Sequence, residues 1–215
     1  HKNEYYTYLL DFGNRKTETV DIYAKAAGVN GERGMIVDLK STDPENWDKD
    51  NYVFAENPTD AIIWEVHVKD FSHSPSSGVT PENRGKYLAF CEHSTLYGEG
   101  IVPTCVDYLK NLGVTHVQIN PFYDFGSIDE SKNDDSFNWG YDPKNYNVPE
   151  GSYSSNPYDG NVRITECKQM IQALHNAGIG VIMDVVYNHT YQGGGSFFDL
   201  SVPGYYYRYH HNGSW

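Results

Sequence analysis

The sequence is poor in positive charge and lacks long hydrophobic runs. Against 29 Asp and Glu residues it has 16 Lys and Arg, which gives a formal net charge of −13 over 215 residues. A surface of this sign repels phosphate backbones and anionic lipids, so nucleic acid and membrane surfaces are poor candidates as partners. No apolar run approaches the roughly 18 residues that a membrane span needs.

Cysteine is also scarce. Cys91, Cys105 and Cys167 are odd in number and lack the spacing of metal ligands. Cys105 and Cys167 fall within helical patterns, and we expect both to be buried thiols. The chain starts at His1 with neither an initiator Met nor a signal-peptide pattern, which predicts a processed or truncated piece and leaves its compartment open.

Aromatic residues, in contrast, are plentiful. They make up 15% of the chain, with 19 tyrosines and 4 tryptophans. Aromatic faces suit the stacking of sugar rings, and a neutral, polyhydroxylated partner is compatible with the acidic charge. For most of the tyrosines, ordinary packing in the core or at the surface is the simpler explanation. A chain of this length can bury one good core, or one domain with part of another.

Residues 1–57 differ from the remainder because they show no helical periodicity of useful length. Short strands are expected over 5–12, 20–26 and 35–39, with Gly- and Asn-rich punctuation between them. We interpret residues 1–57 as the C-terminal strands of an accessory β-sandwich and a linker. Three strands make a poor independent domain.

From residue 58 to 215 the pattern changes to strands that alternate with helices. Such alternation argues for an α/β fold with a parallel sheet. Thr104 and Asp107 form a capping-box pattern at the start of the first helix. The elements are expected at 61–68 (strand), 104–112 (helix), 114–120 (strand), 165–177 (helix) and 181–186 (strand).

The polar residues of the three strands fall on one face of each strand. A doubly wound sheet lies under helices on both sides, so both of its faces should be apolar. In a closed barrel one face looks inward and can be polar near the mouth, which favours the first three strands of a (β/α)8 barrel. For Glu65 and His67 the simpler interpretation is a satisfied polar pair inside the barrel. The polar positions are Glu65 and His67, then His116, Gln118 and Asn120, then Asp184.

Two long connections, 70–103 and 121–163, follow the first two strands. Long ordered loops at the C-terminal ends of strands are usually functional, so we expect them to form the rim of a cleft. The second carries FNWGYDP, in which Trp139 and Tyr141 offer flat apolar faces beside the Asp142 carboxylate. Such a set suits a pyranose ring, and a plain turn cluster explains it equally well.

The third strand runs into the stretch GIGVIMDVVYNHT, residues 178–190. A carboxylate at Asp184 in an apolar strand needs a partner or a function, because an unpaired buried charge is costly. Asn188 and His189 follow where an α/β fold displays its binding groups. This D-x-x-x-N-H pattern resembles the first signature region of the alpha-amylase superfamily of glycoside hydrolases.

The order and spacing of the motifs are similar to those of type I pullulanases, the α-1,6-glucan debranching members of that superfamily. VNGERGMIVDL also resembles the end of the starch-binding-like β-sandwich that precedes their barrel. One departure is Phe137, where these enzymes usually have Tyr. The motifs are WEVHVKDFS (64–72), YLKNLGVTHVQINP (108–121), FNWGYDP (137–143), PEGSYS (149–154), ALHNAGIGVIMDVVYNHT (173–190) and VPGYYYR (202–208).

The resemblance implies a substrate-binding set of Trp139, Tyr141, Asp142, Asn188 and His189. Tyr141 would stack on the sugar at the −1 subsite, with Asp142 in the same wall, bonding sugar hydroxyls or a basic residue. His189 would bond that sugar and steady the transition state. Asp184 would be a supporting carboxylate, and Asn188 would hold the loop. No cofactor is expected; calcium at Asn188 is possible in principle, although six or more oxygen ligands cannot be assembled from the sequence.

The resemblance also implies what the chain does not contain. Retaining glycosidases need a nucleophile and an acid/base carboxylate about 5 Å apart, and in the family both lie on later strands, beyond residue 215. We therefore expect an inactive fragment of a pullulanase-like enzyme that needs the remainder of the barrel, or a complementary chain, beside it. The substrate would be pullulan, amylopectin or limit dextrin, and a secreted or cell-surface bacterial location is favoured over the cytoplasm.

Two alternatives stay open. Within the same chemistry, the chain could derive from an isoamylase-like, branching or glycogen-debranching relative. Outside it, the chain could be a non-catalytic α-glucan-binding protein that uses Trp139, Tyr141 and His189.

Overall fold

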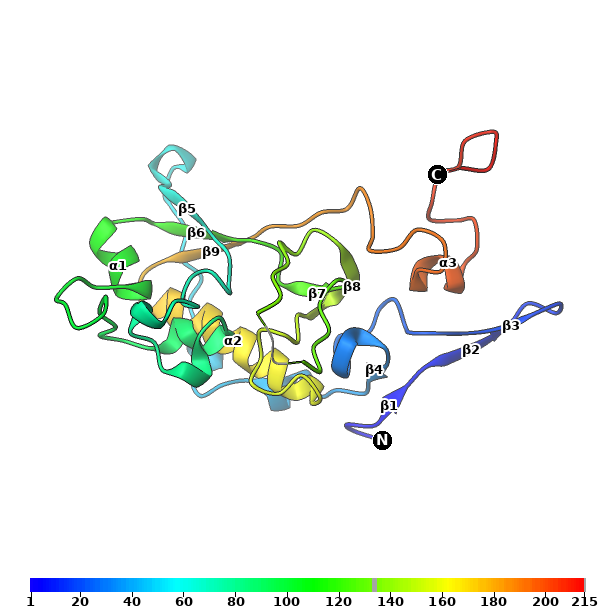
Figure 1. Cartoon of the computed structure of the whole chain (residues 1–215), viewed down its shortest axis with the longest axis horizontal. Helices are drawn as coiled ribbons and strands as arrows, with labels where there is room; N and C mark the ends of the chain where they lie inside the picture. Colours follow the sequence, from blue (N-terminus) through cyan, green and yellow to red (C-terminus); the bar gives the residue numbers. More distant parts are fainter. Residues whose placement is uncertain (133–134, 215) are drawn as a thin grey trace.

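The structure, a computed structural model, describes residues 1–132 and 135–214. Its centre is a parallel three-stranded sheet in the order β5 (Ile63–Val66), β6 (His116–Ile119) and β9 (Gly180–Met183). The helices α1 (Cys105–Leu112) and α2 (Gly160–Asn176) form the two crossovers and lie on the same side of it (Figure 1). The expected alternation of strand and helix is therefore confirmed.

One face of this sheet is apolar and packs under the helices. Val66, Val117 and Ile119 are buried there against Leu109 of α1 and Leu174 of α2. Removing a side chain such as Leu174 from water stabilises the fold by about 1.5–3 kcal/mol. The parity of the strands thus assigns Val66 and Ile119 to the helix side and the alternate, polar positions to the opposite face.

The register of the strands aligns those polar positions in rows. Glu65 lies beside Gln118, and Gln118 beside Ile182, so alternate residues of the three strands point to one side. Two residues further along, on the same side, come Asn120 and Asp184, which directly follow the ends of β6 and β9. The expectation that the polar residues of three strands share a face is confirmed.

The long connection after β6 is more ordered than the sequence indicated. It contains an antiparallel pair, β7 (Tyr123–Phe125) and β8 (Pro143–Pro149), with a shifted register. In β8 the side chains of Pro143, Asn145 and Val148 are buried, and the regular alternation is broken at Tyr146 and Asn147, two successive residues that are less buried. The prolines at both ends of β8 hid this strand from a pattern search, because proline is rare in strand interiors.

The start of α2 and the capping contacts of α1 differ from expectation, whereas α1 itself begins directly after Thr104, as expected. α2 begins at Gly160, five residues before Thr165, because the Asp159 side chain caps it by accepting from the Asn161 N–H at 2.9 Å. The capping box of α1 is wrong. The Thr104 hydroxyl donates to the Ser77 carbonyl instead, and Asp107 accepts from a neighbouring loop amide.

The segment 1–57 contains two antiparallel pairs, β1 (Tyr5–Tyr6) with β4 (Gly34–Met35) and β2 (Tyr8–Asp11) with β3 (Lys16–Thr19). The strand expected over 20–26 is wrong, because the Asp21 side chain accepts from the Tyr23 N–H and turns the chain. The strand expected over 35–39 shortens to β4. Two separate pairs do not establish a sandwich among the described residues.

The remaining elements are short. α3 (Phe197–Ser201) follows the loop after β9 and lies beside β3, and the β2–β3 hairpin projects from the molecule (Figure 1). The single-turn helices are η1 (Val29–Gly31), η2 (Leu39–Thr42), η3 (Trp47–Lys49), η4 (Pro58–Asp60), η5 (Pro75–Ser77), η6 (Pro81–Asn83) and η7 (Tyr87–Cys91).

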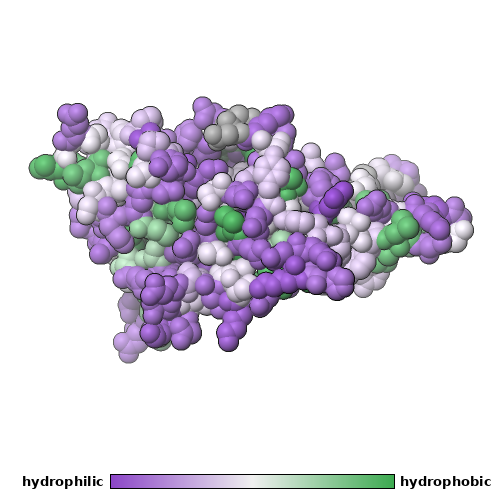
Figure 2. Space-filling view, turned by 90° about the horizontal axis from the view of Figure 1, so that it is seen from below, coloured by the Kyte–Doolittle hydropathy of each residue, from purple (hydrophilic) through white to green (hydrophobic). Residues whose placement is uncertain are grey.

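The surface matches the polar composition. Figure 2 shows a face that is largely hydrophilic, with small and separate hydrophobic patches. None of the helices in the described residues is long and apolar enough to cross a bilayer.

Candidate functional site

Tyr141 occupies the centre of the site, at the C-terminal ends of β6 and β9. Its hydroxyl donates to Asp184 Oδ2 at 2.8 Å, and its backbone carbonyl lies 2.6 Å from His189 Nε2. Tyr141 comes from the loop between β7 and β8, whereas Asp184 and His189 come from the loop after β9. The structure therefore brings three of the expected site residues to one point from two connections.

The Asp184 carboxylate faces the polar side of the sheet. Its Oδ2 also accepts from Gln118 Nε2 at 3.1 Å, and Asn120 Nδ2 lies 3.3 Å from the Tyr141 hydroxyl. Burial raises the pKa of Tyr141, and the hydrogen bond to Asp184 adds to the effect because it stabilises the protonated phenol. Asp184 thus holds the tyrosine ring at the mouth of the sheet.

His189 has a contact at each ring nitrogen. Nε2 carries the hydrogen, because the Tyr141 carbonyl can only accept. Nδ1 lies 2.9 Å from Asn188 Oδ1, a contact that needs either a second ring hydrogen or the opposite orientation of the amide. This contact joins two adjacent residues, and the loop-holding role of Asn188 stays a prediction. A hydrogen bond from His189 to a sugar would replace one of these contacts.

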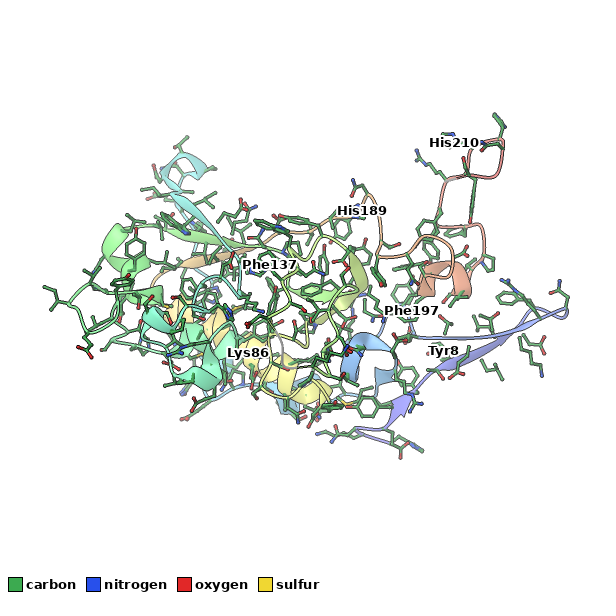
Figure 3. All side chains as sticks on the ribbon, in the orientation of Figure 1. Tyr8, Lys86, Phe137, His189, Phe197 and His210 are labelled. Atoms are coloured by element: carbon green, nitrogen blue, oxygen red, sulfur yellow. The ribbon has the colours of Figure 1, made fainter. Side chains whose placement is uncertain are left out.

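Figure 3 shows the segment that carries His189 leaving β9 and passing over the β7–β8 hairpin. Its backbone is fixed there by the Tyr146 hydroxyl, which donates to the His189 carbonyl at 3.0 Å. Tyr146 lies in β8, so the hairpin that the sequence did not reveal supports the position of the histidine.

Asp142 is held by its own loop. Asn138 Nδ2 donates to its Oδ1 at 2.9 Å, and Ser127 donates to its Oδ2. Neither partner is basic, so of the two expected roles only bonding to sugar hydroxyls stays open. Trp139 is 59% exposed and leaves its ring accessible beside Phe137, whose centroid lies 5.3 Å away.

His67 and Glu65 do not form the expected pair. His67 is buried, with Nε2 2.8 Å from the Asn138 carbonyl, and its ring packs 4.5 Å from that of Phe137. Burial lowers the pKa of His67, so the ring stays neutral near pH 7. Glu65 instead faces Asn120, at 3.5 Å. Each side chain has a partner, and neither needs a catalytic role.

A second group of acidic residues lies behind the site. Asp124, Glu130 and Glu150 are buried with oxygens within 4.8 Å of one another, the arrangement of a metal site. Arg163, also fully buried, lies among them and donates to Glu130 Oε2 at 2.8 Å and Asp124 Oδ1 at 3.3 Å. The guanidinium of Arg163 therefore supplies the positive charge that a metal ion would otherwise bring to these carboxylates.

The remaining oxygens of this cluster accept from N–H groups. Asn145 donates to Asp124 at 2.7 Å, and the Phe125 and Ser152 amides donate to Glu150 at 3.1 and 2.8 Å. Calcium needs six or more oxygens directed at one point. The cluster therefore does not fit calcium.

The fold and this site indicate the class of protein to which the chain belongs. The family of the alpha-amylase catalytic domain matches residues 70–202, and the chain belongs to that family of glycoside hydrolases.

Within the family, the resemblance to type I pullulanases is confirmed. The pullulanase of Bacillus subtilis (strain 168) is 46% identical over 206 residues, which cover 95% of this chain and 28% of that protein. The pullulanase structure from Bacillus acidopullulyticus has a TM-score of 0.93 and 53% identity over 99% of this chain and 26% of its own. That from Paenibacillus barengoltzii, in complex with maltohexaose and alpha-cyclodextrin, has a TM-score of 0.93 and 50% identity.

The chain spans between a quarter and a third of the length of these three relatives. Over that stretch the likeness supports a portion of a (β/α)8 barrel, in agreement with the parallel strands and covering helices described above.

Proposed function

We propose that this chain forms one wall of the sugar-binding mouth of an enzyme that hydrolyses α-1,6 linkages in pullulan and branched α-glucans. The proposal rests on Tyr141, whose two contacts join Asp184 and His189 at 2.8 and 2.6 Å. Trp139 lies in the same loop with an exposed ring. A flat aromatic face bordered by fixed polar groups is what a pyranose ring requires.

In this proposal the side chains of the mouth bind and orient the sugar. Tyr141 stacks on the sugar at the −1 subsite, and Asp142 accepts hydrogen bonds from its hydroxyls. His189 donates to the same sugar after exchanging one of its present partners. Asp184 fixes the tyrosine, and Asn188 fixes the histidine. Hydrogen bonds from charged groups contribute about 1.5–3 kcal/mol each.

The bond-breaking step requires two further carboxylates. A retaining mechanism places a nucleophile and an acid/base about 5 Å apart, and we assign both to strands later in the barrel than β9. No residue of this chain is proposed for either role. The chain alone is therefore expected to be inactive on pullulan.

The remainder of the barrel, or a complementary chain, is the proposed partner. Among the described residues, β5 and β9 each pair only with β6, which leaves two outer edges. Ile62 and Ile63 near the β5 edge are 58% and 52% exposed, and Met183 at the β9 edge is 41% exposed. The accessory β-sandwich over residues 1–57 belongs to the same proposal, as does a secreted or cell-surface location.

Turnover by the intact polypeptide tests the function. We expect new reducing ends from pullulan and weaker turnover from glycogen, and the reverse preference would favour an isoamylase-like or branching relative. Tyr141→Phe should lower kcat/KM about tenfold or more, from the loss of a hydrogen bond to a carboxylate. Tyr97→Phe, at an exposed tyrosine of another loop, is the matched control.

A separate measurement distinguishes binding without chemistry. Affinity electrophoresis in amylopectin should retard the intact polypeptide, and Tyr141→Ala should abolish the retardation. Retardation without hydrolysis would identify an α-glucan-binding protein, and unchanged retardation in Tyr141→Ala would overturn the proposed mouth.

A further inference from the structure

The motif VPGYYYR (202–208) has no role in the mouth as described so far. Its first two tyrosines, Tyr205 and Tyr206, are exposed, whereas the third, Tyr207, is half-buried. The hydroxyl of Tyr207 reaches back to the connection that leads from β9 to α3 (Figure 1). That connection carries His189, so this part of the motif touches the segment on which the sugar-binding histidine lies.

Two hydroxyl residues of this connection flank a run of three glycines, residues 193–195. Glycine loses more conformational freedom on folding than any other residue, so such a run has little preference of its own for one conformation. The Tyr207 hydroxyl lies 2.6 Å from Thr190 Oγ1, before the run, and donates to Ser196 Oγ at 2.6 Å, after it. One side chain therefore closes the glycine-rich segment at both ends. We call these two contacts the Tyr207 clasp.

The Ser196 end of the clasp is fixed to the body of the protein. Ser196 is buried, and its Oγ also accepts from the Asp199 N–H at 3.1 Å, at the start of α3. The helix α3 packs against β3. Tyr207 therefore connects a fixed point of the fold to the residue that directly follows His189.

The backbone around His189 has two further attachments, both to β8. The Tyr146 hydroxyl donates to the His189 carbonyl at 3.0 Å, and the Tyr191 N–H donates to the Pro143 carbonyl at 2.8 Å. To bond a sugar, the His189 ring has to exchange one of its present partners. The backbone must then keep its place while the contacts of the ring change, and Tyr207 adds the attachment to α3.

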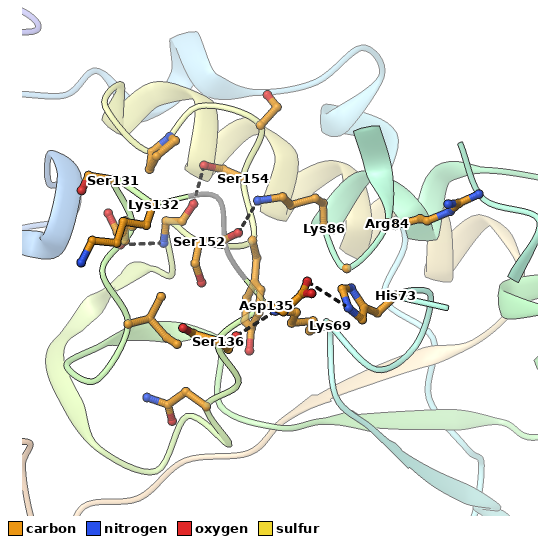
Figure 4. Close-up of a pocket in the computed structure, with 18 of the residues that line it drawn as sticks. Lys69, His73, Arg84, Lys86, Ser131, Lys132, Asp135, Ser136, Ser152 and Ser154 are labelled. Atoms are coloured by element: carbon orange, nitrogen blue, oxygen red, sulfur yellow. Dashed lines mark hydrogen bonds and ion pairs between the residues drawn. The ribbon is translucent and has the colours of Figure 1, made fainter. Parts of the chain in front are cut away.

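The other connections near the mouth are tied to each other directly. Lys69 Nζ donates to the Ser136 carbonyl at 2.8 Å, and Lys86 Nζ donates to the Ser152 carbonyl at 2.6 Å, as the dashed lines in Figure 4 show. These bonds join the loop after β5 to the connection after β6. For the connection after β9, the clasp has the corresponding function.

We propose that Tyr207 is a positioning residue that acts through His189, an inference that rests on the proposed function of the mouth. Without the hydroxyl, the glycine-rich segment adopts more conformations, and His189 is less often placed to bond the sugar at the −1 subsite. His189 is proposed to steady the transition state. The loss should therefore lower kcat and kcat/KM equally and leave KM unchanged.

Pullulan hydrolysis by the intact polypeptide tests this role. Tyr207→Phe keeps the ring and removes the hydroxyl, and it should lower kcat about three- to tenfold, as expected for the loss of a hydrogen bond between neutral groups. KM should stay within about twofold. Tyr205→Phe removes a hydroxyl from the same motif, at a ring that is 74% exposed, and should leave kcat unchanged.

A double-mutant cycle shows whether Tyr207 acts through the histidine. In a His189→Ala background, Tyr207→Phe should cause no further loss of kcat, because the residue that it positions is absent. An equal loss in both backgrounds, or an unchanged kcat in Tyr207→Phe alone, would overturn the inference.

Hydrogen exchange tests the clasp without reference to hydrolysis. In Tyr207→Phe the Tyr191 amide should exchange about three- to tenfold faster, whereas the Asp184 amide, bonded to the Ile119 carbonyl at 3.0 Å, should not change. Unchanged exchange at Tyr191 would refute the clasp even in an active enzyme. Faster exchange at Tyr191 in a polypeptide that does not hydrolyse pullulan would support the clasp and refute the proposed function alone.

Discussion

Arg163→Met should destabilise the region where the N-terminal segment meets the barrel. Its guanidinium is fully buried and holds Asp124 and Glu130. It also donates to the Gly28 carbonyl at 3.1 Å. Removing one partner of a buried ion pair costs about 3–5 kcal/mol, because the other charge is left uncompensated. Methionine fills much of the volume and cannot supply the charge.

Hydrogen exchange measured by mass spectrometry on the intact polypeptide reports this cost locally. The Asn30 and Gly151 amides donate to Glu130 at 2.6 and 3.1 Å, so both report on the cluster. Since about 1.4 kcal/mol corresponds to a factor of ten, a cost of about 3–5 kcal/mol should raise their exchange by about two to three and a half orders of magnitude. Arg15→Met, at an exposed arginine, should leave both unchanged.

The pH dependence of the loss of amide protection in Arg163→Met provides a second test of the same reasoning. Without Arg163 the carboxylates bind protons more tightly, so protonation at low pH relieves the repulsion. The loss of protection should therefore be larger at pH 8 than at pH 5. A loss of less than about fivefold at pH 8, or one that does not depend on pH, would refute the view that Arg163 acts as the counter-ion of this cluster.

Three other outcomes follow from contacts already described. Burial and repulsion by Glu130 raise the pKa of Asp124 to about 7. This group therefore stabilises the fold below about pH 4 and loses that contribution as the pH rises through 7. Asp124→Asn should reduce the difference between the free energies of unfolding measured by urea titration at pH 5 and at pH 8. Gly31→Ala should lower the melting temperature, because φ is +63° and a Cβ would collide with Asp124; a Gly13→Ala control meets no neighbour. EDTA should leave the melting temperature of the intact polypeptide unchanged, whereas a lowered value would reinstate a metal site.

The order of the elements and the polar face of the sheet could be predicted from sequence. Period-2 alternation revealed which side of β5 and β6 is apolar, and Asp184 was recognisable because a carboxylate interrupts a strand of apolar residues. Gln118 and Asn120 were visible as polar positions by the same parity, although their contacts with Asp184 and Tyr141 depend on the register between strands.

Other parts of the site could not be predicted because they depend on contacts distant in sequence. The β7–β8 hairpin positions Tyr146 under His189, and its prolines concealed it. Arg163 interrupts no pattern, since a single basic residue near the start of a helix is ordinary. Only the fold shows that carboxylates from the preceding connection surround it.

The contacts of Arg163 also set an order of events during synthesis. Gly28 and Arg163 are separated by 135 residues, and at about 5–20 residues per second a ribosome needs roughly 7–27 s to make that length. Throughout this interval the segment around Gly28 has been synthesised, but Arg163, whose guanidinium bonds to it, has not. A nascent-chain chaperone that binds residues 1–57 would act during this interval.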